Sequence, residues 1–205
     1  VGEAVPTFAS LAEPVAPRHV RAPRLVYLVL STQHSAEAVG GWQHKHLLGL
    51  GVAVTYDTSE GRMQVYTAET VAALLASLQA ADLVIGFNTR DFDYQVLQPY
   101  TEATLATLPT LAVLDDVQQV LGFRLSLRHL VRETLAVERP DDSVQTLAWY
   151  QAGDRERIVQ QCQRDLTLLR DLVQAGARTG TIFYRDQAGV RTAVPVHWQR
   201  CSDER

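Results

Sequence analysis

The chain has 205 residues, 46% of them hydrophobic, and a formal net charge of −4 at pH 7. This length and hydrophobic content suffice for one well-buried globular domain and not for two. The acidic net charge argues against a protein that binds nucleic acid through an extended basic surface, so any such contact must be local. No stretch has the roughly 20 apolar residues of a membrane span or the layout of a signal peptide, which predicts a cytoplasmic protein with no membrane partner.

The chain is expected to divide into three parts. Residues 1–23 contain four prolines and no sustained periodicity, which predicts an extended or mobile N-terminal segment. A single domain is expected over residues 24–198, followed by a tail over 199–205. The two cysteines have no metal-like spacing, and we expect Cys162 to be buried in a helix and Cys201 to lie in the tail.

The first half of the domain is predicted to hold four strands and one helix. The apolar run at 25–30 has the length of a buried strand. A β-rich segment at 47–58 and a short strand at 63–66 follow it and complete a three-strand meander. Residues 67–80 have helical spacing, and this crossover is expected to lay a buried strand at 82–87 parallel to an earlier one.

The second half is predicted to be mostly helical. Helices are expected over 92–100, 115–121, 126–135, 143–150 and 154–175. Gly176 is expected to cap the last of them. Strands at 181–185 and 191–196 are expected to form a terminal hairpin. The predicted fold class is therefore α/β, with a mixed sheet flanked by helices and a small C-terminal hairpin.

Two motifs resemble a known family of nucleases. The segment GFNTRDFDYQVL at 86–97 resembles the N-x-x-x-F-D segment of the DEDD 3′-5′ exonucleases, in which an aspartate binds the catalytic metals. The segment QQCQRDLTLLRDL at 160–172 resembles that family's closing motif, tyrosine or histidine followed four positions later by aspartate. HSAEAVGGW, LGFRLSLRHLVRETL and VPVHW are also similar to a bacterial branch of predicted exonucleases. The resemblance implies a ribonuclease-H-like fold, with Asp93 and Asp165 at metal-ligand positions.

The resemblance further implies two divalent cations, Mg²⁺ or Mn²⁺, held by four carboxylates. Two of those carboxylates belong to a D-x-E at the end of the first strand, where this chain has Val29 and Ser31. Gln161 stands where the family has the tyrosine or histidine that orients water, and an amide cannot act as a base. Ala112 stands where this branch commonly has an aspartate. We therefore expect no catalytic residue and no cofactor, and the two remaining aspartates are expected to be vestigial.

Other polar residues do not restore a metal site. His34, His44 and His46 lie near the first strand, but H-x-H with a distant third histidine is a weak metal pattern and imidazole suits Mg²⁺ poorly. Surface or capping roles are expected for them. Asp115 and Asp116 are expected at a helix N-terminus, where carboxylates interact favourably with the helix dipole.

A small set of residues is predicted to contact nucleic acid. Arg124, Arg128 and Arg132 fall at i, i+4 and i+8, which predicts a stripe that either binds phosphates or is a solvated helix face. Asn88, within the exonuclease-like segment, joins them as a candidate.

Trp42 and Trp149 are candidates for stacking on bases, although packing in the core or at its rim is the expected role for both.

Three functions stay open. The leading interpretation is a pseudo-exonuclease, a non-catalytic ribonuclease-H-like domain that weakly binds single-stranded DNA or RNA or docks on a nucleic-acid-processing protein. The first alternative is an active 3′-5′ exonuclease with a rearranged site, which would need Mg²⁺ or Mn²⁺. The second is a purely structural protein-interaction subunit. The acidic net charge favours the structural subunit, whereas the arginines favour the pseudo-exonuclease.

Overall fold

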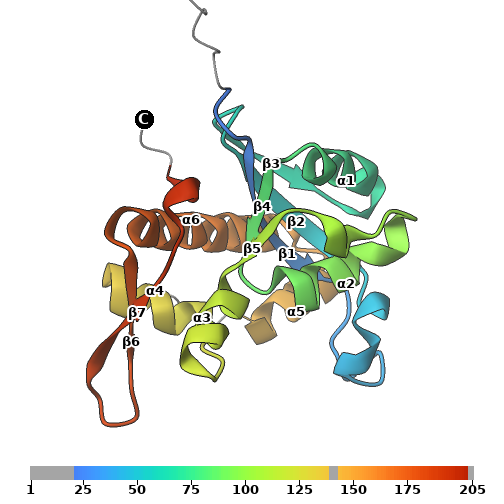
Figure 1. Ribbon diagram of the computed structural model, residues 1–205. Coiled ribbons are helices and arrows are strands. Elements are labelled where there is room, and N and C mark those ends of the chain that lie inside the picture. Colours follow the sequence, from blue (N-terminus) through green and yellow to red (C-terminus); the bar gives the residue numbers. More distant parts are fainter. Residues whose placement is uncertain (1–20, 139–142, 203–205) are drawn as a thin grey trace, which may run out of the picture.

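The computed structural model describes residues 21–138 and 143–202, and it contains a five-stranded sheet (Figure 1). The strands are β1 (Leu25–Thr32), β2 (Leu50–Asp57), β3 (Arg62–Tyr66), β4 (Leu83–Gly86) and β5 (Thr110–Ala112). Their order is β3-β2-β1-β4-β5. β2 is antiparallel to β1 and β3, whereas β4 is parallel to β1 and β5 is parallel to β4. The predicted α/β class, the mixed sheet and the parallel placement of the fourth strand are confirmed.

Two hydrophobic cores form because the side chains of β1 alternate between the two faces of the sheet. Leu25 and Tyr27 belong to one buried cluster, and Val29 packs against it. Val26 and Leu28 belong to a second cluster on the other face. β1 is therefore the central element of both cores.

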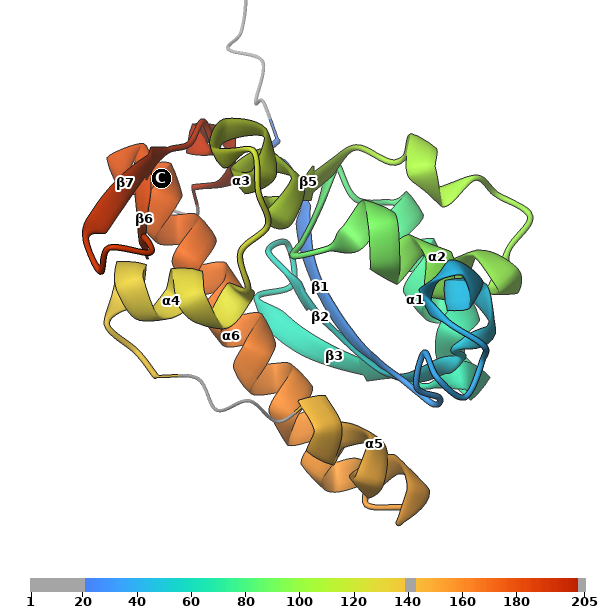
Figure 2. The same cartoon turned by 90° about the horizontal axis from the view of Figure 1, so that it is seen from below.

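Helices cover both faces of the sheet (Figure 2). They are α1 (Val71–Gln79), α2 (Tyr94–Leu97), α3 (Val113–Leu121), α4 (Leu127–Leu135), α5 (Ser143–Gln151) and α6 (Arg155–Thr179). α1 and α2 contribute Leu74, Leu78 and Leu97 to the cluster that contains Val26. On the opposite face α6 packs on β1 and β2, and α4 packs against α6. We call the cluster on this opposite face, which contains Tyr27, the α6-side core.

The C-terminal hairpin of β6 (Thr181–Arg185) and β7 (Arg191–Pro195) is confirmed, and it is fastened to α4. The Thr134 hydroxyl accepts from the backbone N–H of Phe183 at 2.9 Å and donates to its carbonyl at 3.3 Å. The backbone N–H of Arg185 donates to Nε2 of His129 at 2.9 Å. Side chains of α4 thus satisfy polar backbone groups of β6 that no strand pairs.

Three segments differ from their predicted structure. Residues 110–112 form β5, where no strand is predicted. The predicted helix at 92–100 is divided into a π-helical turn (Thr89–Asp93), α2 and a 3₁₀ turn (Gln98–Tyr100). The long helix continues past Gly176, and Gly180 caps it with a left-handed φ of 69°.

Gly176 has a packing role instead of a capping role. A Cβ at this position would lie 2.5 Å from Cε3 of Trp198, whose side chain is fully buried against the helix. The same contact explains why the chain after β7 is not a loose end. Gln199–Cys201, at the beginning of the predicted tail, forms a 3₁₀ turn, and the Cys201 thiol is buried.

The remaining regular segments are short 3₁₀ turns at Trp42–Leu47, Ala68–Thr70 and Leu105–Thr107. Most of the N-terminal segment predicted over 1–23 lies outside the described residues. Within the described ranges, no helix combines the length and the apolar content needed to cross a bilayer.

Candidate functional site

A cleft of about 640 Å³ opens at the C-terminal end of β1, beside the first turns of α6. Its floor brings together positions that the sequence analysis had singled out, namely Val29, Ser31, Gln161 and Asp165. Its walls come from the segment after β1, from Phe92 and from α5. The strand end therefore faces Asp165 of the long helix, as the resemblance implies, whereas the described lining does not include Asp93.

The strand side of the cleft is neutral. Val29 packs against the α6-side core. The Ser31 hydroxyl accepts from the backbone N–H of Val52 at 3.1 Å and donates to its carbonyl at 3.3 Å. Both side chains therefore serve the sheet, and neither supplies a negative charge to the cleft.

The helix side of the cleft holds a polar pair. Nε2 of Gln161 donates to Oδ1 of Asp165 at 3.1 Å, as expected for residues at i and i+4. Arg164 in turn donates to Oε1 of Gln161 at 2.7 Å. Gln161 and Asp165 are both buried, so the amide is positioned by its neighbours and is bonded to the carboxylate.

The described lining of the cleft does not include Asp93, although it includes the neighbouring residue Phe92. Asp93 lies at the end of the π-helical turn, a local widening of the helix that is frequent at functional sites. Burial raises the pKa of Asp93 to about 7. The Thr89 hydroxyl offsets part of this rise, although it forms no well-aligned hydrogen bond within the described ranges.

The π-helical turn packs tightly against the end of β4. A Cβ on Gly86 would lie 2.0 Å from Oγ1 of Thr89 and 3.3 Å from the carbonyl oxygen of Leu28. Glycine at this position is therefore what lets the turn that carries Asp93 approach β1 so closely.

The cleft does not fit a pair of divalent cations. Hard cations need several oxygen ligands, most of them carboxylates. The described lining offers the carboxylates of Asp165 and Glu37, and Glu37 is exposed on the segment after β1. No group of three or more His, Cys, Asp and Glu residues in the described ranges is arranged to hold a metal ion.

Two predicted nucleic-acid contacts, Asn88 and Arg124, bind each other. Nη2 of Arg124 donates to Oδ1 of Asn88 at 3.1 Å, and the guanidinium lies 3.7 Å from the carboxylate of Asp91. Lys45 donates to the same carboxylate at 2.8 Å. These bonds connect the Trp42–Leu47 turn, the π-helical turn and the segment before α4.

The three arginines do not form one helical stripe. α4 begins at Leu127, so Arg124 precedes the helix, whereas Arg128 and Arg132 lie within it. Arg132 donates to the carboxylate of Glu133 at 2.8 Å. The nucleic-acid role of all three stays a prediction.

The aromatic and imidazole side chains near the cleft differ in exposure. Trp42 is 64% exposed and meets Phe92 edge-on at a centroid distance of 6.3 Å, so of the two expected places, the core and its rim, the core is excluded. Trp149 is partly buried against the α6-side core, as expected. His34 lines the cleft, and Nδ1 of His44 lies 3.0 Å from the carbonyl oxygen of Val39.

The acidic pair in α3 has the structural role that was predicted. Asp115 and Asp116 lie in the first turn of α3. Oδ2 of Asp116 accepts from Nε1 of Trp198 at 2.8 Å, and the carboxylate of Asp115 lies 3.9 Å from Arg90. Ala112, one residue before α3, is buried in β5.

Several residues that line the cleft were not found by sequence reasoning, among them Glu37, Phe92 and Cys162. The first two belong to segments that the chain folds over the strand end, and their spacing in the sequence carries no sign of this. Cys162 was expected to be buried, and its place one position after Gln161 in α6 puts it at the cleft floor.

Comparison with known proteins adds no family to these observations. The chain matches no protein-family model, and no curated protein matches its sequence.

Proposed function

We propose that the chain is a pseudo-exonuclease, a ribonuclease-H-like domain that has kept the exonuclease cleft and lost its metal-binding carboxylates. In this proposal it binds single-stranded nucleic acid weakly or docks on a nucleic-acid-processing protein. The order of elements supports the fold assignment: a three-strand antiparallel meander is followed by α1, and β4 then lies parallel to β1.

One observation carries the proposal. The cleft brings Val29, Ser31 and Gln161 to the same place as Asp165, and these are the four positions where the resemblance places two strand carboxylates, a water-orienting group and a helix carboxylate. The arrangement of these four residues supports the alignment, although the described lining does not include Asp93, and three of the four side chains lack the chemistry.

The residues present define what the cleft can do. Metal-dependent phosphodiester hydrolysis needs cations that generate hydroxide and stabilise the displacement at phosphorus. Val29 and Ser31 offer no ligand charge, and the Gln161 amide cannot take a proton from water. What is left is an open cleft with an exposed indole at its rim and a buried amide–carboxylate pair, and none of these groups can generate the hydroxide that cleavage needs.

Docking on a protein partner has its own support. Trp42 and Leu47 lie on the same turn beside the cleft and are 64% and 53% exposed. Large apolar side chains grouped on a surface are typical of protein interaction sites. A partner that covers this turn would also cover the mouth of the cleft.

The test is incubation with end-labelled single-stranded DNA or RNA in Mg²⁺ and in Mn²⁺, following both mobility and length of the strand. The proposal predicts a shift that weakens with salt, a dissociation constant of roughly 10⁻⁴ to 10⁻⁶ M and no shortening. Shortening that Asp93→Ala or Asp165→Ala abolishes would contradict the proposal and establish the active exonuclease. No shift with any strand, together with no shortening, would leave protein docking as the function of the domain.

A further inference from the structure

A second hollow, of about 750 Å³, lies between α4 and the C-terminal hairpin. Phe123 and Leu125, which precede α4, form one side of it together with His129. Residues 184–188, the end of β6 and the turn that follows, form the other side. We call this hollow the hairpin groove, and none of its lining residues belongs to the cleft at β1.

Aromatic rings give the hairpin groove an apolar surface. The rings of Phe123 and Tyr184 meet edge-on with centroids 5.9 Å apart. Phe123 is 46% exposed, which is unusual for so large an apolar side chain. Rings held in place at a surface are the platforms on which unpaired bases stack in proteins that bind single strands.

Arginines are concentrated in the two elements that flank the groove, and one of them, Arg185, lines it beside Asp186. α4 and the hairpin together contain four arginines, Arg128, Arg132, Arg185 and Arg191, against the carboxylates of Glu133 and Asp186. This excess of positive charge stands out in a chain whose net charge is −4. It provides the charge complementarity that a phosphate backbone requires.

Glu133 holds two of these arginines in place, and its single negative charge offsets only one of their two positive charges. It is buried, and its carboxylate lies 2.8 Å from Arg132 and 3.1 Å from Arg185. Its backbone carbonyl accepts from Nε of Arg191 at 2.9 Å, and that guanidinium lies over the ring of Phe183. Arg132 and Arg185 are still 42% and 46% exposed, so one carboxylate fixes them while both reach solvent.

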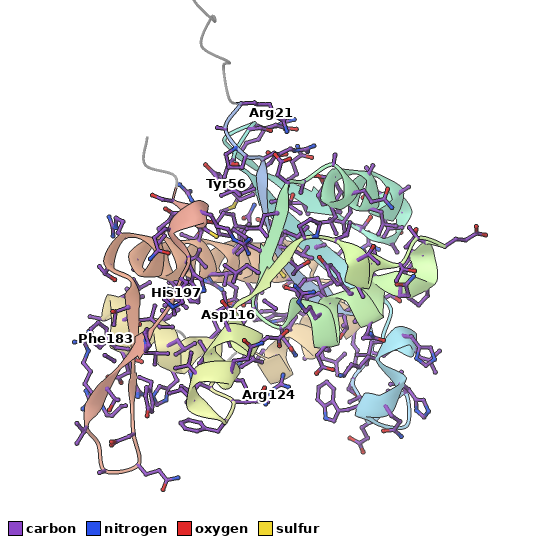
Figure 3. The ribbon with its side chains drawn as sticks, in the orientation of Figure 1. Arg21, Tyr56, Asp116, Arg124, Phe183 and His197 are labelled. Atoms are coloured by element: carbon purple, nitrogen blue, oxygen red, sulfur yellow. The ribbon has the colours of Figure 1, made fainter. Side chains whose placement is uncertain are left out.

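The cleft offers a strand no such charges. None of the described residues that line it is Arg or Lys, and its lining includes the carboxylates of Glu37 and Asp165. Arg164 is bonded to the lining residue Gln161, and Lys45 and Arg124 are bound to Asp91. In Figure 3, Arg124 lies at the lower end of the molecule, and Phe183 marks the hairpin. A polyanion is therefore attracted to α4 and the hairpin more than to the cleft.

We propose that single-stranded nucleic acid binds across α4 and the hairpin groove, with an unpaired base stacked on Phe123 and Tyr184 and with phosphates on Arg128, Arg132 and Arg185. This inference rests on the proposed function in taking nucleic acid as the ligand, and it adds where the strand lies. A duplex is disfavoured, because its bases are already stacked on one another and do not present their faces to a side chain.

The test is fluorescence anisotropy with a labelled oligothymidylate over a range of KCl concentrations. Phe123→Ala is expected to weaken binding roughly tenfold, and Phe123→Tyr is expected to restore it, since base stacking depends on the ring. Arg128→Gln is expected to reduce the slope of log K against log salt by about 0.7. An abasic strand of equal length is expected to bind as weakly to the wild type as oligothymidylate binds to Phe123→Ala.

Two control variants and one variant that discriminates between the groove and the cleft locate the effect. Val65→Ala removes an exposed apolar side chain from β3, and Arg62→Gln removes an exposed arginine from the same strand. Neither is expected to change binding. Trp42→Ala removes the aromatic side chain at the cleft and is expected to leave the affinity within twofold of the wild type.

Each other outcome overturns the inference in a recognisable way. If Trp42→Ala weakens binding and Phe123→Ala does not, the strand lies in the cleft; the inference fails and the proposed function stands. Equal affinity for the abasic strand, or a peptide that binds the groove while oligothymidylate does not, also overturns it. Shortening of the strand would overturn the proposed function, whatever the groove variants do.

Discussion

A buried aspartate lies near each end of β1: Asp57 of β2 near the N-terminal end, and Asp93 of the π-helical turn towards the C-terminal end. Their surroundings move the two pKa values in opposite directions. Near the N-terminal end, burial alone would raise the pKa of Asp57, but hydrogen bonds from Arg24 and Ser59 outweigh burial and lower it. Near the C-terminal end, burial raises the pKa of Asp93 to about 7, and Thr89 opposes it only in part. A buried carboxylate stays ionised when cations and hydrogen-bond donors surround it. Where these are missing, its pKa rises and it takes up a proton.

The N-terminal end is a closed ionic network. Nη2 of Arg24 lies 2.6 Å from Oδ2 of Asp57, while Ser59 donates twice to Oδ1, at 2.9 and 2.7 Å. Asp82 accepts from the backbone N–H of Arg24 at 2.6 Å and from Arg21 at 3.0 Å. Figure 3 labels Arg21 at the top of the molecule, at the opposite end from Arg124. Both carboxylates in this network accept hydrogen bonds from arginine and backbone donors, which indicates a structural role.

The C-terminal end has the opposite character. The polar groups of Ser31 bind the sheet backbone, those of Gln161 bind Asp165, and Asp93 lies in a π-helical turn with little compensation. The ionic network lies at the N-terminal end of β1, whereas these polar contacts at the cleft are hydrogen bonds. We therefore expect changes at the two ends to affect stability in different ways.

The largest effect is expected from breaking the N-terminal network. Asp57→Ala leaves the guanidinium of Arg24 in a site where that side chain is only 19% exposed. Removing one partner of a buried ion pair costs about 3–5 kcal/mol of the free energy of unfolding. Urea denaturation measures it. The matched control is Glu60→Gln, which breaks the exposed pair with Arg62 and should cost less than about 1 kcal/mol. Equal losses in the two variants would show that the network is not structural.

A pH-dependent effect is expected at the other end of β1. Because folding raises the pKa of Asp93 from 3.8 to about 7, the folded state binds a proton that the unfolded chain releases. Stability therefore falls as pH rises from about 4 to about 7, by up to about 1.4 kcal/mol per pH unit. Asp93→Asn, which carries no charge, should be more stable than the wild type at about pH 8 and lose that advantage towards about pH 4. Denaturation in EDTA at both pH values measures this, and a constant difference between the two proteins would refute it.

The smallest effect, none at all, is expected from removing divalent cations. A ligand stabilises a protein only when it binds the native state in preference to the unfolded one. Since the cleft lacks the carboxylates for a cation pair, EDTA should leave the melting temperature of the wild type unchanged. A drop of several degrees would reveal a metal site that the described residues do not show.

The sequence predicts most of the framework because the strands and helices of this chain have clear periodicity. β1, β2, β3 and α1 lie within a few residues of their predicted positions. β5 could not be found in this way, since three residues carry no period and only pairing with β4 makes them a strand. The end of α6 was predicted at Gly176 and lies at Thr179, because a glycine that caps a helix and a glycine that makes room for a tryptophan ring cannot be told apart in a sequence.

The site was predictable only where motif spacing fixes geometry. The i, i+4 contact of Gln161 with Asp165 and their position opposite Val29 follow from a helix that crosses a strand. The environment of Asp93 does not follow from spacing, because the π-helical turn moves its side chain relative to a regular helix. The hairpin groove was also missed, since its rings and arginines come from segments about 60 residues apart that share no pattern.

The claim that the cleft is an exonuclease site without its metal ligands is tested most directly by a variant that restores the two strand carboxylates. Val29 and Ser31 lie two positions apart on β1 and both line the cleft, so Val29→Asp with Ser31→Glu adds two negative charges beside Asp165. Like charges at close range destabilise the fold unless a cation neutralises them. The double variant should melt below the wild type in EDTA and recover in Mn²⁺, with no such recovery in the wild type. A double variant whose melting temperature does not depend on Mn²⁺ would contradict the claim that this cleft is an exonuclease site emptied of its ligands.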